Sequence, residues 1–222
     1  MVALRPGERP VVTVEGLSAR TSSPVVGRPT RQGGQAEAAR RILDAAGPLF
    51  YGQGIRAVSA DAVIDAAGVT KTTFYRHFPT KDDLVVAYLS AVSAAEQRAV
   101  ADWRAAYAGR PVEVLRIYAR TLGEEACGAG FRGCPFLNAV AEYPDDAHPV
   151  HVAVERHRTW LRGAAREVLE QMGVEDPDLT AVELVMVRDG AMAAGRGVPA
   201  TRVTAALLRA GTAIVRAASP GA

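Results

Sequence analysis

A chain of 222 residues is long enough to bury a hydrophobic core without disulfide bonds or a structural metal. Its 49% hydrophobic content excludes a disordered protein, and its formal net charge of +2 gives no global reason to expect nucleic-acid binding. No apolar run approaches the roughly 18 residues of a membrane span, and the first residues lack the apolar stretch of a signal peptide. We therefore expect a cytoplasmic protein with no membrane partner.

The first 34 residues differ in composition from the rest of the chain. Residues 1–34 are rich in Pro, Gly, Ser, Thr and Val, and they carry five arginines against two glutamates. This composition predicts a flexible basic arm. From Gln35 onward apolar residues recur at spacings of three and four nearly to the end, which predicts an all-α body.

Glycine and proline divide this body into about nine expected helices. The expected ranges are 36–51, 60–67, 71–78, 81–108, 111–127, 135–143, 149–172, 177–195 and 201–218. Pro48 lacks a backbone donor and is expected to kink the last turn of the first helix.

The segment 59–78, SADAVIDAAGVTKTTFYRHF, predicts two short helices joined by a tight turn. Ser59 and Thr70 stand where helix N-caps belong, and Gly68 can supply the positive φ of the turn. An apolar seam is expected to hold the two helices together; its members are Val63, Ile64, Ala67, Val69, Phe74 and Phe78. The pattern is typical of a helix-turn-helix.

The second of these helices leaves a polar face, formed by Lys71, Thr72, Thr73, Tyr75, Arg76 and His77. Short hydroxyl side chains permit close approach to the major groove, and Lys, Tyr and Arg bond phosphates and base edges. The alternative is an ordinary helical corner with a solvated polar face.

The stretch GIRAVSADAVIDAAGVTKTTFYRHFPTKDDL resembles the DNA-binding signature of the TetR family, and the resemblance extends from Ala39 to Leu84. It implies a DNA-binding domain over residues 35–80 and a ligand-binding and dimerisation domain over 81–218. The resemblance further implies that Lys71, Thr72 and Thr73 meet bases or nearby phosphates, and that Tyr75 and His77 bond the DNA backbone. By the same resemblance Thr70 caps the recognition helix and touches a phosphate, and Lys81 anchors another.

A palindromic DNA operator requires a two-fold symmetric reader, so the expected partners are double-stranded operator DNA and a second copy of the chain. The last two helices are the expected dimer seam, and the resemblance implies a four-helix bundle there. The apolar residues assigned to it are Leu179, Val182, Leu184, Val185, Val187, Met192, Val203, Leu207, Leu208, Ile214 and Val215. The alternative is a hairpin buried within one chain.

The segment 131–151, FRGCPFLNAVAEYPDDAHPVH, places a short apolar helix between Gly and Pro residues. It resembles the GCPFLNA segment of one TetR subgroup, in which this helix borders an effector cavity. We therefore expect a small, lipophilic effector. Its candidate contacts, any of which could instead be core residues, are Trp103, Tyr107, Tyr118, Phe131, Cys134, Phe136, Leu137, Asn138 and Trp160.

The expected function is a repressor that an effector releases from its operator, with the helix that begins at Lys81 linking the two parts. No cofactor is expected. One alternative on the same scaffold is a metal sensor using His148, His151, His157 and Cys134, and another is a redox sensor using Cys134; reduced thiols are expected at Cys127 and Cys134. A helical enzyme is a rival class, but no nucleophile elbow, P-loop, HExxH or GxGxxG is present in the sequence. A ligand-free architectural protein is the third alternative.

Overall fold

The computed structural model describes residues 31–126, 128, 130–194 and 197–219, and within them it contains nine helices and no strand. The helices are α1 (Arg31–Gln53), α2 (Ala60–Ala67), α3 (Lys71–His77), α4 (Lys81–Ala106), α5 (Pro111–Glu125), α6 (Pro135–Glu142), α7 (Pro149–Gln171), α8 (Pro177–Ala194) and α9 (Ala200–Ala217). The predicted all-α class is confirmed. No helix among the described residues has both the length and the apolar character needed to cross a bilayer.

The first helix is the element whose predicted bounds differ most from the observed ones, whereas the other helix ends lie within two residues of prediction. α1 begins at Arg31, inside the expected arm, because the glycines at 33 and 34 each cost a helix only about 1 kcal/mol and are flanked by good helix formers. Its backbone continues beyond Pro48 to Gln53. Residues 1–30 of the expected arm lie outside the described part of the chain.

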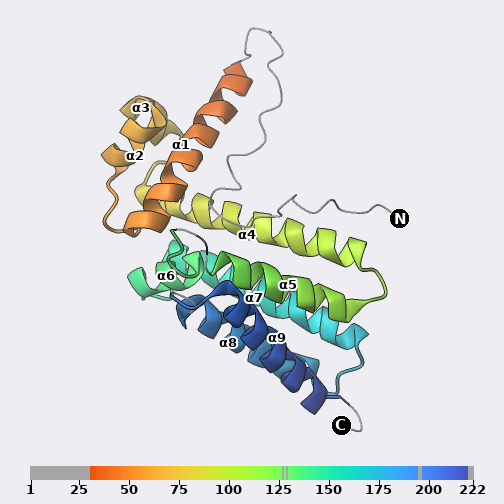
Figure 1. The fold of residues 1–222 in the computed structure, drawn as a ribbon. Helices are drawn as coiled ribbons and strands as arrows, with labels where there is room; N and C mark the ends of the chain where they lie inside the picture. The colour runs from red at the N-terminus through yellow and green to blue at the C-terminus, as the bar shows by residue number, and fades with distance from the viewer. Residues whose placement is uncertain (1–30, 127, 129, 195–196, 220–222) are drawn as a thin grey trace.

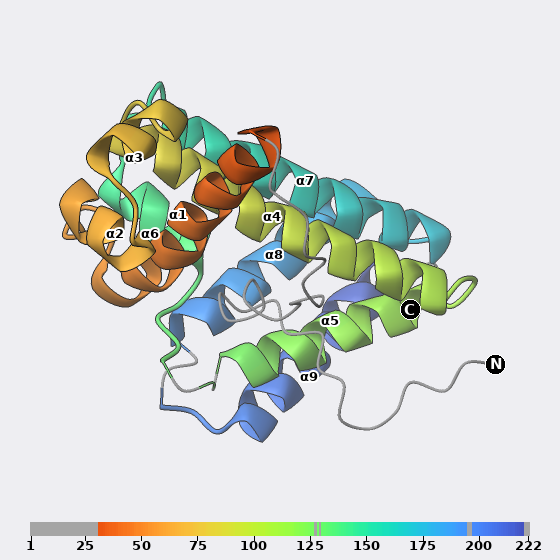
Figure 2. The same ribbon diagram turned by 90° about the horizontal axis from the view of Figure 1, so that it is seen from above.

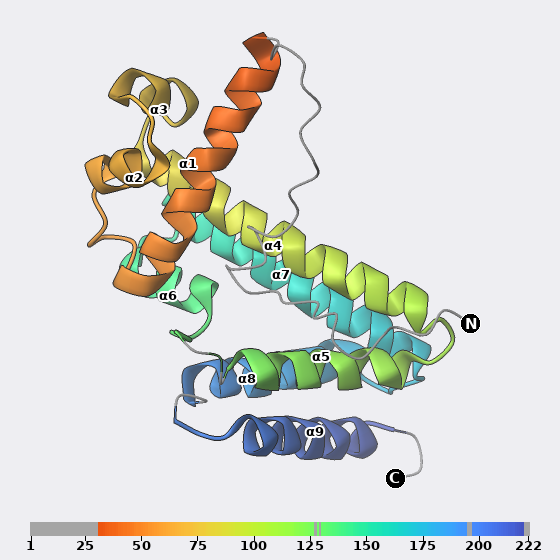
Figure 3. The ribbon, with the colours of Figure 1, turned by 45° about the horizontal axis from the view of Figure 1, so that its top comes forward.

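The helices form a small group carried on a larger bundle. Figure 1 shows α1, α2 and α3 gathered at the N-terminal end of α4, with the remaining helices stacked beneath it. Seen from above, α4 and α5 run along the same side of the bundle, with α6 tucked beneath the α1–α3 group (Figure 2). In Figure 3, α4 lies beside α7, α5 lies beside α8, and α9 is outermost. We call α1–α3 the head and α4–α9 the body.

One hydrophobic core runs from the head into the body. Phe74 of α3 and Ile42 of α1 are fully buried in it, and Phe50 meets Tyr88 of α4 edge to face with ring centroids 5.7 Å apart. Phe136 of α6 and Leu207 of α9 belong to the same continuous cluster. The head therefore cannot move independently of α4 and α6 without breaking apolar contacts.

The expected dimer seam is wrong in part. Val185 and Met192 of α8, and Val203 and Leu207 of α9, are buried within the single chain because these faces pack against α5 and α7. Leu179 and Val182 of α8 remain exposed. Helical periodicity marks apolar faces but does not say which of two faces a partner chain covers.

Helices α5 and α9 approach closely at Gly123. A Cβ atom on this residue would clash with the side chain of Thr204 and lie 3.0 Å from its Cα. The contact needs a glycine because the α9 backbone itself is the neighbour.

We predict that Gly123→Ala lowers the free energy of unfolding by about 1–3 kcal/mol, the usual cost of overpacking a tight contact. Chemical denaturation followed by circular dichroism measures it. Gly163→Ala is the matched control, because a Cβ on Gly163 of α7 meets nothing within 4 Å. Equal stability of the two variants would contradict the tight α5–α9 contact.

Candidate functional site

The turn between α2 and α3 has the geometry that its sequence predicts. Ser59 Oγ accepts from the backbone amide of Ala62, and Thr70 Oγ1 accepts from that of Thr73, each at 3.1 Å. Gly68 adopts φ of 61°, the left-handed conformation that glycine tolerates best. Val63, Ile64, Ala67 and Phe74 are buried, so α3 is fixed on α2 by its apolar side.

The opposite side of α3 is polar and largely exposed. Thr72, Arg76 and Lys71 face solvent, and Tyr75 has 46% of its surface exposed. Lys71 makes only an exposed ion pair, with Asp61 at 2.9 Å, and such a pair contributes little to stability. Thr73 is half-buried and receives a hydrogen bond from the hydroxyl of Thr70.

Two of the expected DNA contacts are placed differently. The imidazole of His77 is half-buried, and its Nε2 is buried with no hydrogen-bond partner among the described residues. Lys81 does not project freely: its Nζ donates to the carbonyls of Ile55 and Val58 at 3.0 Å, and to that of Arg56 at 3.4 Å. The loop between α1 and α2 has no helical partners for these carbonyls, which explains why the ammonium group is drawn to them.

The same loop is held from the other side by α6. Glu142, the last residue of α6, accepts from the backbone amide of Ile55 at 3.0 Å and from that of Arg56 at 2.6 Å. Tyr143, which follows it, donates its hydroxyl proton to Asp82 of α4 at 2.9 Å. The end of α6 thus binds both the head loop and the start of α4.

The other end of α6 is also tied to the head. Tyr51 of α1 donates to the carbonyl of Gly133 at 2.9 Å and accepts from the amide of Arg132 at 3.0 Å. Asn138 donates its side-chain amide to the carbonyl of Arg132 at 2.9 Å, which stiffens this loop. This eight-residue helix is therefore linked to the head directly at its C-terminal end and, at its N-terminal end, through the loop that precedes it.

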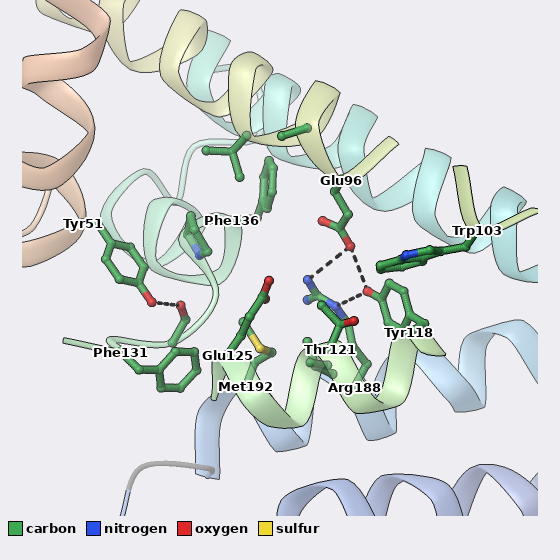
Figure 4. A pocket seen from close by; sticks show the side chains of 15 residues that line it. Tyr51, Glu96, Trp103, Tyr118, Thr121, Glu125, Phe131, Phe136, Arg188 and Met192 are labelled. Carbon is green, nitrogen blue, oxygen red and sulfur yellow. Dashed lines mark hydrogen bonds and ion pairs between the residues drawn. The ribbon is translucent and has the colours of Figure 1, made fainter. Parts of the chain in front are cut away.

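A cavity of about 80 Å³ lies between this helix and the bundle (Figure 4). Aromatic side chains from α4, α5 and α6 and the loop before α6 form much of its wall, and Figure 4 shows Trp103, Tyr118, Phe131 and Phe136 around it. Four of the nine predicted effector contacts, the residues just named, thus line one cavity.

The other five predicted contacts do not line it. Asn138 is used in the local turn, and Cys134 is buried beside it with its Sγ 3.4 Å from Nη1 of Arg188. The remaining three pack elsewhere, as core or surface aromatic and aliphatic residues; they are Tyr107, Leu137 and Trp160.

The polar centre of the cavity was not predicted from the sequence. Glu96 of α4 and Arg188 of α8 are each 7% exposed, and Tyr118 lies between them. The Tyr118 hydroxyl donates to Glu96 at 2.8 Å and accepts from Nε of Arg188 at 3.1 Å, while the guanidinium lies 3.9 Å from Glu96. Burial raises the pKa of Tyr118, so its hydroxyl stays protonated and serves as the donor. The available signal was a pair of charged residues within each of two largely apolar stretches: Glu96 and Arg98 in AVSAAEQRAV, and Arg188 and Asp189 in LVMVRDGAMA.

His157 borders this polar centre. Its ring stacks on Phe136 with centroids 3.5 Å apart, and its Nδ1 lies 3.0 Å from the hydroxyl of Ser93. Burial, followed by the charges of Arg188 and Arg158, lowers the pKa of His157 to about 3. The imidazole is therefore neutral, and its 3.6 Å approach to Glu96 is not an ion pair.

The metal-sensor alternative finds no site in the described part of the chain. Among the residues that are described, no three His, Cys, Asp or Glu side chains could share an ion. His148 accepts from the amide of Val150 as the cap of α7, and His151 lies beside the carbonyl of Tyr143. Cys127 lies outside the described residues, so the expected state of that thiol is untested.

Two capped helices that cross at a glycine, with a polar face on the second, define a helix-turn-helix protein. Residues 42–88 match the model of the bacterial regulatory proteins of the tetR family. A solved structure of SCO4454, a TetR-family transcriptional regulator from Streptomyces coelicolor, is 42% identical; the match covers 83% of this chain and 97% of that chain, with a TM-score of 0.77. The chain belongs to the TetR family, whose members are transcriptional regulators and not enzymes.

Curated relatives match over only part of their length. The HTH-type transcriptional regulator AcrR of Shigella flexneri is 35% identical over 89 residues, which is 40% of this chain and 41% of AcrR. YjdC of Escherichia coli, another HTH-type transcriptional regulator, is 29% identical over 62 residues, 28% of this chain and 32% of YjdC. The chain thus spans about a third to two fifths of the curated relatives it matches.

We predict that stability falls as the pH is lowered from about 7 toward 4. The folded-state pKa of His157, about 3, lies below the ordinary histidine value of 6.5, so the unfolded chain binds more protons in this window. The slope contributed by this group approaches 1.4 kcal/mol per pH unit at most. Denaturation at several pH values, with His157→Gln for comparison, measures it; an unchanged slope in the variant would contradict the assignment.

Proposed function

We propose that this protein is a homodimeric repressor that binds a palindromic DNA operator and is released from it by a small lipophilic effector. The observation that carries the DNA-binding part is the exposed polar face of α3, held rigidly on α2 by caps and buried apolar residues. Thr72, Tyr75 and Arg76 are the contacts best placed for bases and phosphates, with Lys71 beside them. Thr70 and Thr73 support the start of the helix, and Lys81 acts chiefly by holding the head loop.

The exposed apolar stripe on α8 supports the homodimer. Leu179, Val182 and Met186 lie at helical spacing on one face and are 56%, 41% and 68% exposed. Large apolar side chains grouped on an exposed helix face are typical of a protein interface. A two-fold axis beside α8 and α9 would place two heads on one side of the dimer, as a palindrome requires.

The size of the aromatic cavity supports coupling between effector and head. Ligand pockets usually measure about 300–1,000 Å³, so an effector entering a space of about 80 Å³ must displace its walls. Phe136 of α6 is one of these walls, and α6 is bonded to the head at both ends. We infer that the effector shifts α6 together with α4, and that this favours head positions that no longer fit the operator.

The segment 133–139, GCPFLNA, is proposed to define a subgroup in which α6 has this role. The presence of cavities in the body weighs against a purely architectural DNA-binding protein. Cys134 is 1% exposed, which disfavours its reaction with an oxidant in this state.

Thr72→Ala and Tyr75→Ala should each lower operator affinity by about tenfold or more at fixed salt, because each protomer loses a bond to a charged or base-edge group. Fluorescence anisotropy with a labelled operator measures this affinity. Thr159→Ala, on the exposed surface of α7, is the control and should bind normally. If both head variants bind like the control, α3 is not the reading helix.

Met186→Glu should dissociate the dimer, because it places a carboxylate at the most exposed position of the apolar stripe. Sedimentation velocity at micromolar protein measures the change. Val152→Glu on α7 is matched to it, since Val152 is also about half exposed, and this variant should remain dimeric. A monomeric wild type, or a dimeric Met186→Glu variant, would overturn the proposed interface.

Glu142→Ala should weaken operator binding although it lies outside α3, because the amides of Ile55 and Arg56 lose their acceptor and the head loop loosens. Hydrogen exchange should become faster at these two amides, while the exchange of α3 amides stays protected. Glu124→Ala, exposed on α5, is the control for charge. Unchanged exchange at both amides would rule out this link.

A further inference from the structure

A second and larger cavity lies in the body, on the other side of Arg188 and Tyr118. It measures about 300 Å³ and is enclosed mainly by α5, α7, α8 and α9. Arg188, Tyr118 and Leu122 contribute to the walls of both cavities and therefore separate them. None of the remaining residues proposed above to contact the effector lines the second cavity.

Its walls are aliphatic. Leu115 of α5, Leu184 of α8, and Leu208 and Val215 of α9 face it, and all four are only half-buried although they lie between helices. Water in such a space would find few hydrogen-bond partners, so an aliphatic occupant is favoured over solvent.

The exposed polar groups of this cavity lie at the end opposite to Arg188. Gly123 near the end of α5 touches Thr204 near the start of α9, so the two helices are antiparallel, and the first turns of α5 lie beside the last turns of α9 (Figure 3). This arrangement brings Arg116 and Arg216, which both line the cavity, to the same end. Both side chains are exposed there, together with Val112 and Thr212.

Neither arginine forms a buried ion pair in the described part of the chain. Arg116 pairs with Glu113 at 2.6 Å on the surface of α5, where half of the arginine side chain is exposed. Arg216 forms no ion pair with any residue in the described part of the chain. By contrast, Arg188 at the inner wall is already bonded to Tyr118 and Asp189 and lies close to Glu96.

We propose that this cavity binds a fatty carboxylate, with the unbranched alkyl tail between α5, α7, α8 and α9 and the carboxylate at Arg116 and Arg216. The tail suits the aliphatic walls, and the head meets two cations at the one end where charge is accessible. This site is separate from the aromatic cavity, and its occupancy does not depend on operator binding.

Isothermal titration calorimetry of the full chain with hexanoate, octanoate and decanoate, each below its micellar concentration, tests the site directly. We expect saturable binding whose affinity rises about fourfold per added methylene, the factor that corresponds to burying one CH₂ group. Decyltrimethylammonium, which has a similar tail and a cationic head, should bind more weakly than decanoate. No saturable decanoate binding, or equal affinity for the cationic probe, would overturn the proposal.

Two variants fill the cavity from opposite walls. A Cβ on Gly211 of α9 meets only Leu184, at 3.6 Å, so Gly211→Leu extends into the space and also favours the helix. Ala119→Leu does the same from α5. Each should lower decanoate affinity by about tenfold or more, since part of the tail is excluded. Gly163→Leu on α7 is the matched control, and affinity equal to this control in both folded variants would refute the location.

Arg116→Gln and Arg216→Gln test the head group. Each should weaken decanoate about twofold to fivefold, the range of a solvent-exposed ion pair, and the effect should shrink as salt is raised. Arg120→Gln, one helical turn farther along α5 and exposed, should leave the affinity unchanged. Loss of affinity in Arg120→Gln equal to that in the other two would indicate a general charge effect and contradict the assigned carboxylate position.

Discussion

The position of the head depends on which side chains form hydrogen bonds with the backbone of one short loop. The loop between α1 and α2 has carbonyls and amides that no helix can pair, and leaving them unpaired and buried would be costly. Lys81 of α4 donates hydrogen bonds to the carbonyls, and Glu142 of α6 accepts hydrogen bonds from the amides. Because one partner comes from each side, the loop acts as the joint between the head and two separate elements of the body.

The buried charged residues of the body fix the relative positions of its helices more than they add to its stability. Glu96, Tyr118 and Arg188 come from α4, α5 and α8, and their hydrogen bonds join three helices whose other contacts are apolar. Apolar contacts tolerate small shifts, whereas a buried carboxylate and guanidinium lose much when separated. A neutral His157 beside them avoids adding a third charge to this region. The network therefore defines one preferred spacing of α4 against α8, and a ligand that changes this spacing acts directly on the helix that carries the head.

The two cavities differ in size and in the chemistry of their walls, and so they suit different ligands. The aromatic cavity is small, has a polar centre and is bounded by α6, which is tied to the head at both ends. The aliphatic cavity is larger, and its walls belong to the helices that also provide the exposed α8 stripe. In the proposed mechanism, occupancy of the first would change the orientation of the head, while occupancy of the second would change the packing of the bundle. Tyr118 and Arg188 line both, so the two sites share a wall through which they can influence each other.

Local chemistry determined much of this protein from the sequence alone. Ser59, Gly68 and Thr70 act on neighbouring backbone groups, so the helix-turn-helix and its polar face could be read without knowledge of the rest of the chain. The helix boundaries after residue 59 follow from glycine, proline and periodicity for the same reason. The early start of α1 was not predicted, because a pair of glycines weakens a helix without ending it.

Only the tertiary structure decided what depends on residues far apart in the chain. Lys81 has the sequence context of a phosphate anchor, but it meets carbonyls some 25 residues earlier, and Glu142 meets amides 86 and 87 residues away. The apolar faces of α8 and α9 were visible as patterns, yet packing against α5 and α7 chose which face is buried within one chain. Pairing between distant polar groups and the choice between two apolar faces are set by the relative placement of whole helices. No local residue pattern encodes that placement.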